Sequence, residues 1–408
     1  MKFSKLSQLF LVSSIGLLVA ILFTACEIQT IDYVFVADSA GSGSSSAGQI
    51  NTFAVDSESG ALRMGASSVP SGGSTPVALA VTPDYANLYV ANQGNNSVVH
   101  FAIAGNGVLT QKDLVTTSTK PVSLAVNSAG TYLYVISGTA TSTLTEYSLS
   151  SGTIGAVASQ VTLAIPSYTT DSLVPTGITV LANNATVSGN AVYVTAYDQS
   201  AYNPGGTATS TANPGWVFGY TIGASGALSA VSGSPWKAGV KPSAIVSDPT
   251  DRFVYVTDYA SNQMIGYSIQ SGSILNFLTN GPFKTGNEPV AIVIDPRGKY
   301  IYAANSLDST VSAWSIDLAT GTPAGTANVV GSAANTTDTQ PLSLVVDPAL
   351  GRFIYTANHL GNSISGFRLD PDNGTLSTTQ ATPYITGAQP TAVVAVPHGN
   401  HSLQATTP

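Results

Sequence analysis

Short apolar runs bounded by turn residues recur along the whole chain, in a fixed order. A proline and a Val-containing run are followed by a polar turn and a Tyr-containing run. Each half has the length and composition of a short β-strand between turn residues. Six complete copies are present: Pro76–Val81 with Leu88–Asn92, Pro121–Val126 with Leu133–Val135, Pro175–Val180 with Val192–Thr195, Pro242–Val246 with Val254–Asp258, Pro289–Ile294 with Ile301–Asn305, and Pro341–Val346 with Ile354–Asn358.

A second pattern lies downstream of each Tyr-containing run: an apolar residue, a few polar residues, Gly, and usually Leu or Ile. Val55–Leu62, with Gly60, is the first example and Leu369–Leu376, with Gly374, is the last. Glycine at a position that needs positive φ is a hairpin signal. Each repeat therefore predicts four antiparallel strands, which is one blade of a β-propeller.

The two ends of the repeat region are complementary. Tyr33–Asp38 is a tyrosine strand without a proline strand before it, and Pro390–Val396 is a proline strand without a tyrosine strand after it. Pairing the two would complete a seventh blade and leave no open sheet edge. We therefore expect an all-β fold over residues 33–397, a seven-bladed β-propeller of four-stranded antiparallel blades whose ring is closed by its N- and C-terminal strands.

The N-terminal residues have the pattern of an export signal. Lys2 and Lys5 precede an apolar stretch from Leu9 to Phe23. This stretch is about 15 residues long, shorter than the ~20 that a transmembrane helix needs. It ends in Leu22–Cys26, which resembles the lipobox of bacterial lipoproteins. That resemblance implies a signal peptide over 1–25, acylation of Cys26, a linker over 26–32 and anchoring of an exported protein to a membrane of the cell envelope. Residues 398–408 are expected to form a disordered tail.

Composition excludes several classes of function. Charged residues are only 8% of the chain, with 13 Lys and Arg against 21 Asp and Glu and no basic run, so a nucleic-acid partner is excluded. The single cysteine excludes internal disulfides and multi-cysteine metal sites. No nucleophile, phosphate-loop or metal-ligand motif is present, and we expect neither a cofactor nor a metal.

The Tyr-Val-Ala-Asn run at 89–92, Tyr-Val-Thr-Ala at 193–196 and Tyr-Val-Thr-Asp at 255–258 resemble the repeats of YVTN-type propellers. These belong to the lactonase-type seven-bladed β-propeller superfamily, which includes 6-phosphogluconolactonase-like enzymes. In the lactonase branch a His, often with a neighbouring Arg, follows the inner-strand proline. Here no His or Arg follows any of the seven prolines, so the resemblance transfers no catalytic residue.

The residues that end the tyrosine strands are expected to surround one mouth of the propeller. They could bind a polar ligand or cation, or they could cap the following turns through side-chain to backbone hydrogen bonds. His359 follows one of them, and it and Asp258 are the weak candidates for a catalytic base. The ring comprises Asp38, Asn92, Ser137, Asp198, Asp258, Asn305 and Asn358.

Three segments break the repeat and are expected on the same face. Tyr197–Trp216 inserts an aromatic and Ser/Thr-rich loop that includes Tyr202, Ser39–Gly48 inserts a Gly/Ser-rich loop, and Ala156–Val174 is a long connection. Loops on rigid scaffolds carry function, and Tyr and Trp favour recognition surfaces. Tyr202 and Trp216 therefore join the candidate binding face.

Three functions remain open. The leading hypothesis is a lipid-anchored, non-catalytic binding or scaffold protein whose partner is another protein or a cell-envelope polymer. The alternative is a lactonase that uses rearranged residues such as His359, Arg252 and Arg297. A cell-surface structural component is the third.

Overall fold

The structure, a computed structural model, describes residues 29–40, 47–139, 141–166, 172–181, 190–202, 214–223, 225–324 and 335–398. The expected signal peptide, Cys26 and the tail beyond residue 398 lie outside this part of the chain. Within it, no helix is long and apolar enough to span a membrane.

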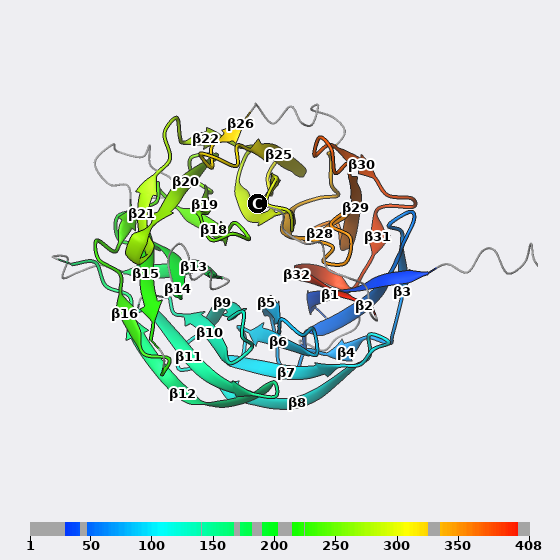
Figure 1. The fold of residues 1–408 in the computed structure, drawn as a ribbon. Helices are drawn as coiled ribbons and strands as arrows, with labels where there is room; N and C mark the ends of the chain where they lie inside the picture. Colours follow the sequence, from blue (N-terminus) through cyan, green and yellow to red (C-terminus); the bar gives the residue numbers. More distant parts are fainter. Residues whose placement is uncertain are drawn as a thin grey trace, which may run out of the picture.

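Seven antiparallel sheets surround a central axis, so the all-β seven-bladed propeller is confirmed (Figure 1). In each sheet the proline strand is innermost and the tyrosine strand is second. The first blade is composite, and its strands from the axis outward are β32 (Ala388–Pro397), β1 (Thr30–Ala40), β2 (Gln49–Asp56) and β3 (Leu62–Met64), with β4 (Val69–Pro70) also paired to β2.

The second to fourth blades follow in chain order. The second has β5 (Pro76–Val81), β6 (Asn87–Asn92), β7 (Ser97–Ile103) and β8 (Leu109–Thr116). The third has β9 (Pro121–Val126), β10 (Tyr132–Ser137), β11 (Thr143–Ser150) and β12 (Thr153–Thr162). The fourth has β13 (Leu173–Val180), β14 (Ala191–Asp198), β15 (Gly215–Ile222) and β16 (Leu228–Ala230), with β17 (Trp236–Lys237) also paired to β15.

The last three blades repeat this arrangement. The fifth has β18 (Pro242–Ser247), β19 (Phe253–Asp258), β20 (Gln263–Gln270) and β21 (Ile274–Phe277), with β22 (Phe283–Lys284) paired to β20 and a 3₁₀ turn, η1 (Ser271–Ser273), in the hairpin. The sixth has β23 (Pro289–Ile294), β24 (Tyr300–Asn305), β25 (Thr310–Ile316) and β26 (Pro323–Ala324). The seventh has β27 (Pro341–Val346), β28 (Phe353–Asn358), β29 (Ser363–Leu369) and β30 (Leu376–Thr378), with β31 (Tyr384–Ile385) paired to β29.

The seam of the ring is the predicted pairing of the two chain ends. β1 and β32 are antiparallel, with Tyr33 opposite Val396 and Val36 opposite Val393. β1 begins at Thr30, three residues before the expected boundary at 33. Closure removes the exposed edge that either strand would have alone.

One expected connection is shorter than predicted. The segment Ala156–Val174 was expected to be a long loop, but β12 continues to Thr162 and β13 begins at Leu173. β12 stays paired with β11 along most of its length, from Thr153 opposite Ser150 to Thr162 opposite Thr143, so the segment up to Thr162 is strand and not loop.

Neighbouring blades are joined at the hairpin glycines. Gly321 has φ +71°, and a Cβ there would lie 2.2 Å from the Phe253 ring of the preceding blade. The Tyr255 hydroxyl donates to the Gly321 carbonyl at 2.5 Å. The repeated tyrosine is thus an inter-blade hydrogen-bond donor, and the same bond is made by Tyr89 to Gly152, Tyr193 to Ser273, Tyr302 to Gly374 and Tyr355 to Gly60.

Candidate functional site

The predicted ring of strand-ending residues is present, but its side chains are buried in the loops of the mouth. Asp38, Asn92, Asp258, Asn305 and Asn358 have no exposed surface. Each accepts or donates hydrogen bonds within its own blade or with the loop that enters that blade from the preceding one, as a turn cap does. The partners are Asn51 and Thr386 for Asp38, Ser71 for Asn92, the Gly286 amide for Asn305, Ser363 and Ser365 for Asn358, and the Ser172 amide for the nearly buried Asp198.

Asp258 illustrates what these caps do. Its two carboxylate oxygens accept the backbone amides of Val240 and Lys241, both at 2.9 Å. A carboxylate committed to two amides and buried away from the channel is poorly placed to take a proton from a substrate. Asp258 instead positions the residue in front of the inner strand.

The side chains that flank the channel mouth are the neighbours of the caps. The residue after a cap donates its amide to the carbonyl of the residue before the inner-strand proline, as Tyr259 does to Lys241 at 2.9 Å and His359 to Gln340 at 2.8 Å. Sequence reasoning had looked directly after each proline and missed this ring. Its signal is a charged or amide side chain directly before five of the seven prolines, namely Lys120, Lys241, Glu288, Gln340 and Gln389.

The richest part of this mouth is a cluster around Lys241, which we call the Lys241 corner: Lys241, Tyr197, Tyr202, Tyr259 and Glu288. The Lys241 ammonium lies 4.6 Å from the ring centroid of Tyr259, 5.2 Å from that of Tyr202 and 5.5 Å from that of Tyr197. The rings of Tyr197 and Tyr202 meet edge to face, with centroids 5.5 Å apart. The expected insertion thus does bring Tyr202 to the mouth.

Burial sets the electrostatics of this corner. It lowers the pKa of Lys241 below its ordinary value, and the carboxylate of Glu288 partly opposes that change. Burial also raises the pKa of Tyr259 to about 12, with interaction with Glu288 acting in the same direction. The corner therefore combines the amine of Lys241, the phenol of Tyr259 and the carboxyl group of Glu288, all half-buried.

The axial channel below the mouth has different chemistry. A cavity of about 220 Å³ lies among the inner strands and is lined by apolar residues and by five hydroxyl side chains. Ser243 and Thr391 use their hydroxyls to bridge to the carbonyls of Pro289 and Pro76 in the next blades. No titratable side chain is among the residues that line this cavity.

The remaining candidates are dispersed. His359 is half-buried in the seventh blade, with Nδ1 3.3 Å from the Pro390 carbonyl. Trp216 packs against the core between the third and fourth blades, where the Lys237 ammonium lies 3.6 Å from its ring centroid. In the described part of the chain, no group of three or more His, Cys, Asp or Glu could hold a metal ion.

The structure corrects the expectation that Arg252 and Arg297 could act with His359. Arg252 precedes β19 and Arg297 lies in the turn before β24, at the opposite end of the ring from the mouth. A strand of six residues spans roughly 20 Å. Both arginines are also engaged there, Arg252 with the Leu318 carbonyl at 2.6 Å and Arg297 with Asp295 at 2.7 Å.

Comparisons with known proteins agree with this fold. The profile of the family described as "Lactonase, 7-bladed beta-propeller" matches residues 46–169 and 235–405. No curated protein matches the sequence.

Solved structures resemble the chain over most of its length. A Bacteroides uniformis protein provisionally named a 6-phosphogluconolactonase has a TM-score of 0.69 at 18% identity, covering 90% of this chain and 100% of its own. A similarly named Bacteroides fragilis protein has 0.67 at 19%, covering 91% and 99%. The periplasmic gluconolactonase of Pseudomonas aeruginosa has 0.68 at 18%, covering 90% and 99%. At these identities the likeness concerns the fold.

Proposed function

The chain belongs to the seven-bladed β-propeller lactonase family, and we propose that it hydrolyses a sugar-type lactone at the Lys241 corner. One observation carries this proposal: the corner gathers an ammonium, a carboxylate and three aromatic rings from three blades at the channel mouth. Binding sites for small molecules combine aromatic walls with a few polar groups in this way. The family and the gluconolactonase-named structures favour a cyclic sugar ester as the ligand.

Each group of the corner has a step to perform. The Lys241 ammonium would hold the lactone carbonyl and stabilise the oxyanion that forms when water adds to the carbonyl carbon. Glu288 would accept a proton from that water and return it to the ring oxygen as the ester bond breaks, releasing a hydroxy acid. Tyr197 and Tyr202 supply flat aromatic surface against the sugar ring.

Asp258 is a positioning residue in this scheme. Its bonds to the amides of Val240 and Lys241 fix the backbone from which the ammonium extends. The residues directly after the inner-strand prolines would take no part in proton transfer. Val, Thr, Ser and Leu occupy those places.

The test measures acid release from glucono-δ-lactone and its 6-phosphate by pH-stat with the full-length protein, corrected for spontaneous opening. Lys241→Met is expected to lower kcat/KM by about 10²–10³-fold, the range for loss of one oxyanion donor. Lys120→Met is the matched control, because Lys120 is an exposed lysine directly before the proline of the third blade. Its activity should be unchanged. Wild-type protein without turnover, or a fully active Lys241→Met variant, would refute the proposal.

A second candidate function, ligand binding without hydrolysis, is favoured by the hydroxyl- and apolar-lined channel, which contains no titratable side chain. It predicts saturable binding of an unreactive sugar acid such as gluconate, lost in Tyr202→Ala, with no lactone turnover. Measured by calorimetry beside the pH-stat assay, this outcome separates the two functions.

A further inference from the structure

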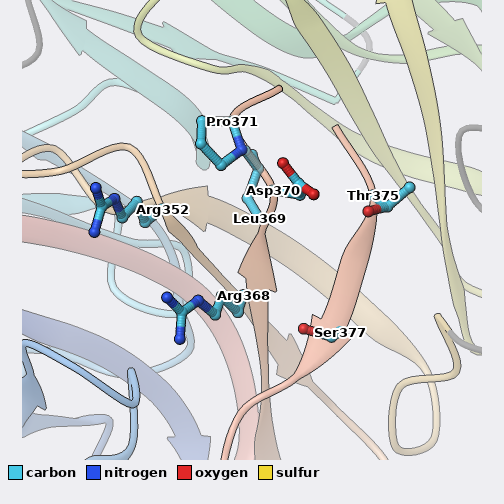
Figure 2. A pocket seen from close by; sticks show the side chains of 7 residues that line it. All are labelled: Arg352, Arg368, Leu369, Asp370, Pro371, Thr375 and Ser377. Carbon is cyan, nitrogen blue, oxygen red and sulfur yellow. The ribbon is translucent and has the colours of Figure 1, made fainter. Parts of the chain in front are cut away.

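A second pocket lies at the opposite end of the ring from the mouth, in the seventh blade. Its volume is about 380 Å³, and it is lined by Arg352, Arg368, Leu369, Asp370, Pro371, Thr375 and Ser377. Figure 2 shows both arginine side chains extending to the same side of the strand that carries Leu369.

Strand register brings these residues together. Arg352 directly precedes Phe353, which is opposite Arg368 on β29, and Arg368 is in turn opposite Ser377 on β30. The backbone also ties the pair, since the Leu369 amide donates to the Arg352 carbonyl at 2.6 Å. Both arginines are therefore held side by side by the sheet, while their side chains are exposed.

Within the part of the chain that the structure describes, neither guanidinium forms an ion pair with a carboxylate. The ion pairs of the described residues are His100–Asp113 and Arg297–Asp295, and neither includes Arg352 or Arg368. Among the described residues, the partner of the Arg368 guanidinium is the uncharged backbone carbonyl of Glu58, at 3.3 Å. Asp370 is the acidic residue of the pocket, but its oxygens accept the Asp372 amide and the Asn373 side chain within the hairpin turn.

Two neighbouring arginines that form no ion pair with any described residue are unusual in so acidic a chain. The chain has a net charge of −8 and only 13 Lys and Arg among 408 residues. In the fifth blade the equivalent arginine, Arg252, is bound to the Leu318 carbonyl and to Thr250. Two unpaired positive charges that lie close together repel each other, and an anion bound between them would relieve that repulsion. Guanidinium groups bind planar carboxylates and tetrahedral phosphates through paired hydrogen bonds.

We propose that this pocket binds an oxyanion of the phosphate or sulfate class. Arg352 and Arg368 would donate charge-assisted hydrogen bonds to its oxygens, and the hydroxyls of Thr375 and Ser377 would supply further donors. The site is separate from the Lys241 corner, so it does not depend on the proposed lactone chemistry. The same phosphate chemistry occurs in a soluble phosphate ester and in a lipid headgroup.

The experiment uses the full-length protein and two probes. Calorimetry at constant ionic strength measures binding of pyrophosphate, and flotation measures binding to phosphatidylcholine vesicles with and without phosphatidylglycerol. The Arg352→Gln/Arg368→Gln double variant should bind pyrophosphate at least tenfold more weakly than wild type. Lys299→Gln is the matched control, because Lys299 is an exposed cation directly before Tyr300 at the same place in the sixth blade. Its affinity should stay within twofold of wild type.

The flotation result distinguishes a lipid headgroup from a soluble phosphate ester as the ligand. Arginine-dependent flotation with phosphatidylglycerol vesicles assigns the site to a lipid headgroup, and pyrophosphate binding without flotation assigns it to a soluble ester. The proposal is overturned if wild type shows no saturable pyrophosphate binding, if the double variant binds as wild type does, or if Lys299→Gln weakens binding equally. An unchanged melting curve for the double variant shows that its fold is intact.

Discussion

At the scale of single residues, the tyrosine of the second strand donates an inter-blade hydrogen bond in five blades of the described chain. The residue opposite it on the third strand decides how much room its ring has. Tyr255, Tyr193 and Tyr355 face glycine on the third strand, which leaves room for the ring. The third blade differs, because Tyr134 faces Glu146. There, within the described residues, neither the buried Tyr134 hydroxyl nor the buried Glu146 carboxyl group makes a well-formed hydrogen bond.

Tyr302→Phe should destabilise the protein by about 1–3 kcal/mol, because it leaves the buried Gly374 carbonyl without its donor at 2.8 Å. Tyr300→Phe is the control in the same strand, since its hydroxyl lies 3.5 Å from the Pro371 carbonyl. Chemical denaturation of both variants checks this expectation. Equal losses of unfolding free energy would show that the Tyr302 hydroxyl contributes no more than the longer contact of the Tyr300 hydroxyl, and would contradict this prediction.

Glu146 should make stability depend on pH. Burial raises its pKa from 4.5 to about 7. Between these values the folded state binds more protons than the unfolded state, so stability falls as pH rises from about 4.5 to 7. Glu146→Gln should therefore be more stable than wild type above pH 7, by about 1–3 kcal/mol, and the difference should vanish towards pH 4.5. Melting temperatures across this range test the sign, and a constant difference at all pH values would contradict it.

At the scale of elements, closure of the ring depends on β32, the most C-terminal strand. β32 contributes Ala392, Val393, Ala395 and Val396 to the buried core. It pairs with β1 through eight residue pairs, from Asp32–Pro397 to Ala40–Ala388, whose members lie more than 300 positions apart in sequence. The blades on either side of the seam pack through it, so its loss would affect two inter-blade cores.

A chain that ends at Gly387 should not fold cooperatively. Each large buried side chain contributes roughly 1–3 kcal/mol, which together with lost strand pairing approaches the whole stability of a domain. A chain that ends at His398 retains every described strand and should melt like the full-length protein. Calorimetric scans compare the two, and a cooperative transition in the shorter chain would mean that the ring closes in another way.

At the scale of the whole molecule, the two ends of the propeller carry different chemistry. The mouth presents aromatic, amine and carboxylate groups, whereas the opposite end presents Asp-capped turns and an arginine pocket. We propose that an acyl group on Cys26 holds this ring at a membrane of the cell envelope, since the preceding residues resemble a lipobox. One lipid-bearing terminus with two or three acyl chains is sufficient for stable anchoring.

Cys26→Ser should abolish labelling by a fatty-acid analogue and move the protein from the membrane pellet to the supernatant. The labelling and fractionation are done in cells that express the full-length chain. Retention of the variant in the pellet after a high-salt wash would contradict acyl anchoring.

Several features were determined by the sequence alone, because they repeat. The spacing of Pro76, Tyr89 and Gly107, recurring through the chain, predicts four strands per blade and positive φ at the hairpin glycine, and all seven such glycines have it. The orphan strands at Tyr33 and Pro390 predict the seam. These features depend on local periodicity and turn chemistry, which a linear pattern records directly.

Tertiary structure alone decided which polar groups face the mouth. Asp258 and Asn305 occur in a conspicuous pattern, but the loops fold over them and bury them as caps. Lys241, Tyr202 and Glu288 belong to loops of three different blades, and they meet only because the ring brings those loops to one rim. Lys241 and Glu288 share a position before an inner-strand proline, but nothing in that position shows that Tyr202 lies beside Lys241. The proximity of Arg352 and Arg368 likewise follows from antiparallel register, which sets Phe353, the residue after Arg352, opposite Arg368. Contacts between distant segments depend on closure of the ring and on the register of its strands. The residues around Lys241 or Arg352 in the sequence show neither of these.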